Sequence, residues 1–114
     1  MDRIIRNAKE EIMKLEETLK IIDDFMVHAP EGCLKWQNKS GKTYYYQQYL
    51  EQGANESTSK WNRRYIKKKD ISLARNLAQK HYYATMRPLL EKRLDSLKKF
   101  VISCVVINLY MVFI

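Results

Sequence analysis

The sequence is poor in the residues that build metal-centred, covalent or phosphate-loop sites. It has two cysteines, two histidines and three glycines in 114 residues. Cys33 and Cys104 have no partner at C-x-x-C spacing, and two cysteines cannot form a disulfide scaffold. His28 and His81 have no second ligand at metal-binding spacing, and three glycines leave no Gly-rich phosphate loop. The sequence therefore predicts no metal, no cofactor and no enzymatic activity.

A secretion signal is also lacking, because Asp2, Glu10 and Glu11 interrupt any apolar run at the start. We therefore expect a cytoplasmic protein with reduced thiols. A long uncharged run stands instead at residues 100–114, FVISCVVINLYMVFI, which is shorter than the roughly 20 residues of a membrane-spanning helix. Three interpretations stay open: an anchor that makes the protein membrane-associated, a packed helix or strand, and the accidental terminus of a truncated protein.

Acidic residues are scarce beyond the first part of the chain. The whole sequence has 21 Lys and Arg against 13 Asp and Glu, for a net charge of +8. Residues 1–31 carry −3, residues 32–69 carry +7 and residues 70–114 carry +4. A basic middle favours an anionic partner, and nucleic acid is the commonest one. The alternative is a soluble protein that is merely basic.

The first 29 residues have the pattern of a heptad helix. Apolar residues recur at alternating spacings of three and four, and Pro30 ends the segment. Such a narrow stripe needs a partner helix, either from the C-terminal part of the same chain or from a second copy in a homodimer. The stripe consists of Ile5, Ala8, Ile12, Leu15, Leu19, Ile22 and Met26.

The middle of the chain favours three β-strands, because aromatic and β-branched residues are enriched there. We predict strands over 33–36, 42–50 and 61–66, with a hairpin turn at 38–41. A polar loop over 51–60 separates the last two strands.

A second long helix is predicted from Ile71, with Asp70 as its N-cap and an interruption or kink at Pro88. The fold class is therefore α+β: a long helix, a three-stranded antiparallel sheet and a kinked C-terminal helix that pairs with the first as an antiparallel hairpin. We divide the chain into a heptad arm, a sheet with its packing helix, a helix continuation and an apolar tail, at 1–29, 32–87, 88–99 and 100–114. The apolar stripe of the second helix contains Tyr83, Met86, Leu90, Leu94, Leu97 and Val101.

The basic, aromatic sheet is the candidate nucleic-acid site. Alternation places Trp61, Arg63 and Tyr65 on one face of their strand. A sheet with a helix on one side leaves its other face open to phosphates and bases. The alternative is that the aromatics are core and the charges are solvated. The candidate residues are Lys42, Tyr44, Tyr46, Arg63, Arg64, Tyr65, Lys67, Lys68 and Lys69.

The segments GKTYYYQQ, WNRRYIKKKD and ISLARNLAQ resemble the arm-type DNA-binding domain of tyrosine recombinases. In that family the sheet enters the major groove of DNA and the helix packs behind it. The resemblance implies one of two DNA-facing sets. The first is Lys42, Tyr44, Tyr46, Arg63 and Tyr65, and the alternate set includes Tyr45, Gln47 and Arg64.

A second resemblance covers about residues 10–100. The motifs PEG-x-L, GK-x-YYY, RYIKKKD and LA-x-x-LA-x-K-x-YY are similar to the N-terminal region of uncharacterised bacterial proteins. Longer members of that group continue into a domain that looks like a restriction-type nuclease. The match departs at the apolar tail, so it implies no activity for this chain and favours a truncated protein.

These observations predict a small non-enzymatic module that binds DNA through its sheet. The alternative is a coiled-coil interaction protein tethered to a membrane by residues 100–114. In that alternative, the heptad stripe is the functional surface.

Overall fold

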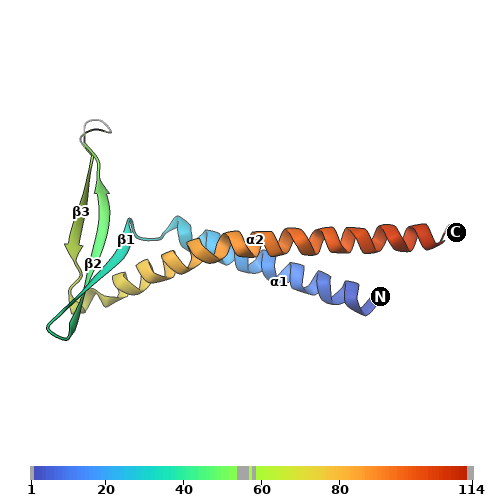
Figure 1. The fold of residues 1–114 in the computed structure, drawn as a ribbon, viewed down its shortest axis with the longest axis horizontal. Coiled ribbons are helices and arrows are strands. Elements are labelled where there is room, and N and C mark those ends of the chain that lie inside the picture. The colour runs from blue at the N-terminus through green and yellow to red at the C-terminus, as the bar shows by residue number, and fades with distance from the viewer. Residues whose placement is uncertain (1, 54–56, 58, 113–114) are drawn as a thin grey trace. The chain divides into compact units, whose positions relative to one another are not determined.

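The structure is a computed structural model that describes residues 2–53, 57 and 59–112. Its order confirms the predicted α+β class: a helix, a three-stranded antiparallel sheet and a long helix (Figure 1). The chain forms two compact units, residues 25–84 and residues 1–24 with 85–114. The elements are α1 (Asp2–Val27), β1 (Cys33–Lys39), β2 (Lys42–Glu51), β3 (Lys60–Tyr65), the 3-10 turn η2 (Lys68–Asp70) and α2 (Ile71–Val112).

The sheet has the order β1-β2-β3 with both pairs antiparallel. Ser40 and Gly41 join β1 to β2 with φ angles of 51° and 77°, as expected for a two-residue hairpin loop that follows the twist of the strands. Because two residues complete the turn, Lys39 still pairs with Lys42. The first predicted strand and the turn at 38–41 are therefore corrected: β1 continues to Lys39 and the turn is shorter.

One face of the sheet is covered by the first turns of α2. Ile66, Ala74 and Leu77 form the buried core, and Leu34 and Tyr45 from the strands pack against it. The Ile66 N–H also donates to the Tyr45 carbonyl at 2.9 Å, which continues the β2–β3 ladder past Tyr65. Small Ala74 lets the helix backbone approach the sheet closely.

Three successive carbonyl groups just before β1 are held by side chains. The Lys80 ammonium donates to the Pro30 carbonyl at 2.9 Å and to the Gly32 carbonyl at 3.0 Å. The buried Gln47 amide donates to the Glu31 carbonyl at 2.8 Å. These bonds fix the start of β1 against both β2 and α2.

The other unit is a helical hairpin, in which the heptad stripe of α1 faces the second half of α2. Ala8, Leu15 and Ile22 are buried at a spacing of seven residues, and the rest of the predicted stripe is half-buried. On α2 the predicted stripe is half-buried as well and is extended by Cys104, which is 3% exposed. The chain's own C-terminal helix therefore covers the stripe.

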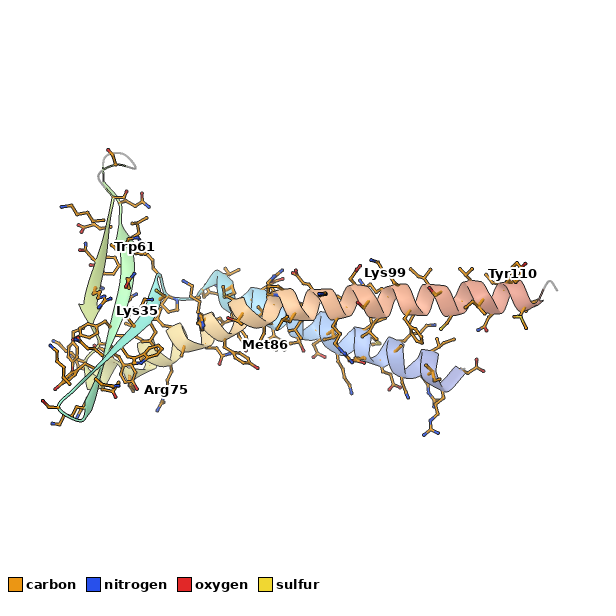
Figure 2. The ribbon with its side chains drawn as sticks, in the orientation of Figure 1. Lys35, Trp61, Arg75, Met86, Lys99 and Tyr110 are labelled. Carbon is orange, nitrogen blue, oxygen red and sulfur yellow. The ribbon has the colours of Figure 1, made fainter. Side chains whose placement is uncertain are left out.

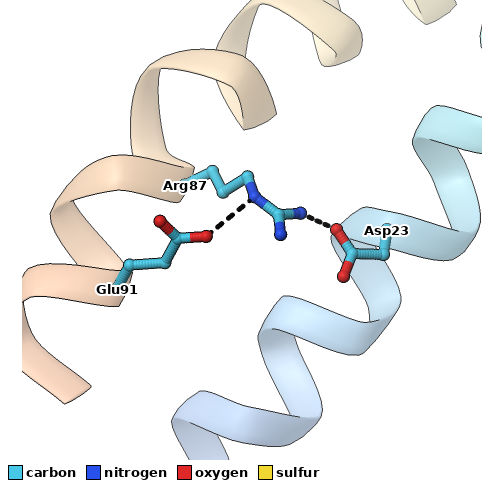
Figure 3. Close-up of polar contacts among 3 residues, drawn as sticks. All are labelled: Asp23, Arg87 and Glu91. Carbon is cyan, nitrogen blue, oxygen red and sulfur yellow. Dashed lines mark hydrogen bonds and ion pairs between the residues drawn. The ribbon is translucent and has the colours of Figure 1, made fainter. Parts of the chain in front are cut away.

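Ion pairs between exposed side chains join the two helices beside the apolar stripe. Arg87 pairs with Asp23 across the hairpin and with Glu91 at 2.9 Å on its own helix (Figure 3). Arg93 pairs with Glu11, whose carboxylate accepts a hydrogen bond and raises the pKa of the guanidinium. These side chains are largely exposed, so the pairs orient the helices more than they stabilise them.

Helix α2 continues through Pro88, so of the predicted interruption or kink the interruption does not occur. Proline has no N–H and cannot donate to the carbonyl of Ala84, four residues earlier. The division between the two units falls between Ala84 and Thr85, at the turn that loses this hydrogen bond. Met86 and Leu90, on either side of Pro88, are both half-buried.

The last part of α2 extends past the start of α1 (Figure 1). Val101 and Cys104 are covered within the hairpin, whereas residues 105–112 are exposed. The segment predicted as a tail is thus a continuation of α2, packed only as far as Cys104. Over residues 2–53, 57 and 59–112, no helix has the length and apolarity needed to cross a membrane.

Candidate nucleic-acid interface

Strand register assigns every side chain of the sheet to one of two faces. Paired residues share a face, so Leu34, Tyr45 and Gln47 lie together with Ile66 on the face that α2 covers. We term the opposite side the open face. It consists of Cys33, Lys35, Gln37, Lys39, Lys42, Tyr44, Tyr46, Gln48, Leu50, Trp61, Arg63 and Tyr65.

The open face is basic and carries no carboxylate among these residues. Lys35 and Lys39 come from β1, Lys42 from β2 and Arg63 from β3, and all four side chains are exposed. Figure 2 labels Lys35 and Trp61, which lie on the two outer strands. Like charges on adjacent strands repel one another, so this face favours an anion that neutralises them.

Aromatic rings cluster at the centre of the open face. Tyr46 and Tyr65 are cross-strand partners whose ring centroids lie 5.9 Å apart, and Tyr44 lies 6.2 Å from Tyr65. Tyr65 is 47% exposed and Trp61 is 65% exposed. Exposed rings of this kind can stack on bases, and the tyrosine hydroxyls can donate to phosphate oxygens.

A groove of about 480 Å³ adjoins the tyrosine cluster at the end of β3. Lys42 lines it from β2, and Lys67 and Lys68 line it from the turn before α2. Tyr44 and Tyr65 also line it, and Ile66 and Ile71 add aliphatic surface, so the groove combines cations with aromatic and apolar side chains. We term it the lysine groove, and its composition suits a phosphate backbone.

The structure brings together most of the predicted site. Lys42, Tyr44, Tyr46, Arg63 and Tyr65 all lie on the open face, which is the first of the two sets implied by the recombinase resemblance. The alternate set lies on the covered face. Lys69 is exposed in η2 but does not line the lysine groove.

Arg64 is the predicted residue that lies apart from the others. It pairs with Gln47 and so belongs to the covered face. Its guanidinium carbon lies 5.1 Å from the centroid of the Tyr49 ring. Arg64 therefore takes part in a cation–π contact beyond the edge of the core.

Lys35, Lys39 and Trp61 belong to the open face but were missing from the predicted site. Lys39 was missed because the hairpin turn was predicted too early, which placed it outside the strand. Alternate residues of a strand share a face. A first strand extended to Lys39 would therefore have placed Lys35, Gln37 and Lys39 on one face, and this signal in the sequence identifies the two lysines.

No group of three or more His, Cys, Asp or Glu side chains comes together in the described part of the chain in a way that could hold a metal ion. The open face offers ammonium, guanidinium, amide and phenol groups. Those groups donate hydrogen bonds to phosphates and base edges.

Comparisons with protein-family models, curated proteins and solved structures find no match to this chain. The resemblances to recombinase arm domains and to nuclease-linked bacterial proteins therefore stay predictions.

Proposed function

We propose that this protein is a non-enzymatic module that binds DNA through the open face and the lysine groove. The observation that carries the proposal is the segregation of charge on the sheet. Four exposed basic side chains and no carboxylate share the open face, and two further lysines continue it into the groove. Phosphate neutralisation by such groups supplies most non-specific affinity for DNA.

The exposed aromatics add a second argument for nucleic acid over a small anion. A phosphate ion needs only a few donors, whereas Trp61 and the tyrosine cluster spread aromatic surface across the face. Base stacking uses such surface and is tolerant of sequence. The heptad stripe, on which a coiled-coil interaction protein would depend, is already covered by α2.

Binding of a short duplex DNA measured at several salt concentrations tests the proposal. If about four to six phosphates are contacted, log K should fall with log salt at a slope of about −4 to −5. Affinity should then drop roughly 10²- to 10³-fold between 50 and 200 mM salt. A dissociation constant that is independent of salt, or no binding at 50 mM, would contradict the proposal.

A further inference from the structure

The open face exposes flat aromatic surface that double-stranded DNA cannot use fully. In a duplex the bases stack on one another, so a protein reaches only phosphates, sugars and the edges of the base pairs. Unpaired bases also offer their flat faces, and aromatic side chains stack on them. The form of DNA that this surface prefers therefore depends on how its exposed rings are placed.

Strand β3 places two rings on either side of a cation. Trp61, Arg63 and Tyr65 alternate along the strand on the open face, and all three side chains are exposed. Four strand residues separate the two rings by about 13 Å. Neighbouring phosphates of one B-form strand are only about 3.4 Å apart along the axis. The two rings thus reach different nucleotides, and Arg63 comes between them, where its guanidinium can pair with a phosphate.

Each of the two rings lines a hollow of the surface. Tyr65 contacts Tyr44 and Tyr46 and is still 47% exposed, so its neighbours hold the ring while part of it stays accessible. It lines the lysine groove. Trp61 is 65% exposed and lines a second hollow, of about 400 Å³, together with Gln52. The Gln52 amide can both donate to and accept from the edge of a base.

We propose that the open face prefers single-stranded DNA, with Trp61 and Tyr65 each stacked on an unpaired base and Arg63 paired with a phosphate between them. This inference rests on the proposed function, because the same basic surface supplies the phosphate contacts. It adds unpaired bases as the feature that is recognised. For the same number of phosphates, the salt slope is smaller for single strands than for a duplex, about 0.7 against 0.9 per contact. The preference for the single strand should therefore grow as salt is raised.

Binding of one DNA strand of about 12 nucleotides, alone and annealed to its complement, tests the preference. We expect the full chain to bind the single strand about tenfold more tightly than the duplex at 200 mM salt. Trp61→Ala should weaken binding of the single strand about tenfold and leave binding of the duplex within about twofold. Trp61→Phe keeps a ring and should retain most of the affinity.

Trp36 provides the matched control, because it is also 65% exposed but lies on the opposite face of the sheet. Trp36→Ala should leave both affinities unchanged. Fluorescence reports stacking directly, since Trp36 and Trp61 are the two tryptophans of the chain. In the Trp36→Phe variant the single strand should quench the emission of Trp61. In the Trp61→Phe variant the emission of Trp36 should not respond.

The outcomes separate this inference from the proposed function. Salt-dependent binding that favours the duplex, or equal losses for Trp36→Ala and Trp61→Ala, would overturn the inference and leave DNA binding standing. No binding of either form at 50 mM salt would overturn both. Circular dichroism checks that each variant keeps its sheet, and if Trp61→Ala does not fold, the absence of quenching in Trp36→Phe would overturn the inference on its own.

Discussion

Replacing Gly32 by alanine is expected to destabilise the sheet unit by about 2–6 kcal/mol. Gly32 has a φ of +84°, and a Cβ built on it would lie 2.1 Å from the Gln48 carbonyl oxygen. The obstacle is backbone of the central strand, which cannot move without breaking the sheet. The carbonyls around Gly32 are also held by Lys80, so the segment cannot retreat.

Gly41 provides the matched control. Its φ of +77° carries a similar conformational cost, but a Cβ there meets nothing within 4 Å. Gly41→Ala should therefore cost only about 1 kcal/mol. Urea unfolding followed by tryptophan fluorescence compares the two variants, since Trp36 and Trp61 both lie in the sheet. Equal free energies of unfolding for the Gly32→Ala and Gly41→Ala variants would contradict the close approach of the Gly32 backbone to the Gln48 carbonyl.

Removing the three cations of the lysine groove is expected to weaken DNA binding roughly 10²-fold at 100 mM salt. The variant replaces Lys42, Lys67 and Lys68 with alanine. Each lost phosphate contact lowers the slope of log K against log salt by about 0.9, so the slope should shrink by about 2–3. The loss should be similar for all DNA sequences, because phosphate contacts carry no sequence information.

A triple variant on α1 controls for the change in net charge. Lys9, Lys14 and Lys20 are exposed on the hairpin helix, so their replacement by alanine removes the same charge elsewhere. We expect its affinity to stay within about threefold of the unaltered protein. If both triple variants lose affinity equally, the groove is not the contact and binding reflects overall charge alone.

The helices and the alternation of the strands could be predicted because their patterns are local. The spacing of Ala8, Leu15 and Ile22 on α1 identifies the buried stripe without a structure. The spacing does not show whether α2 or the α1 helix of a second copy covers that stripe. Both helices have an apolar stripe with the same helical spacing. The long-range ion pairs and burial in the hairpin decide for α2.

The open face could not be chosen from the sequence because tyrosines lie on both sides of β2. Tyr44 and Tyr46 have the same residue type as Tyr45, and local propensity does not separate them. What distinguishes them is the packing of Tyr45 against the core of Ile66, Ala74 and Leu77, which come from later segments. Arg63 and Arg64 are both candidate residues for the same reason, since an arginine on a strand is compatible with either face.

Two neighbouring arginines allow the most direct test of the open face as the DNA interface. Arg63 lies on the open face and Arg64 on the covered face, one position apart on β3. Each is replaced by glutamine in turn, and duplex DNA binding is measured as a function of salt. Arg63→Gln should weaken binding about threefold to tenfold and lower the salt slope by about 0.9, whereas Arg64→Gln should leave both within error. Equal losses, or a larger loss for Arg64→Gln, would contradict the assignment of the open face.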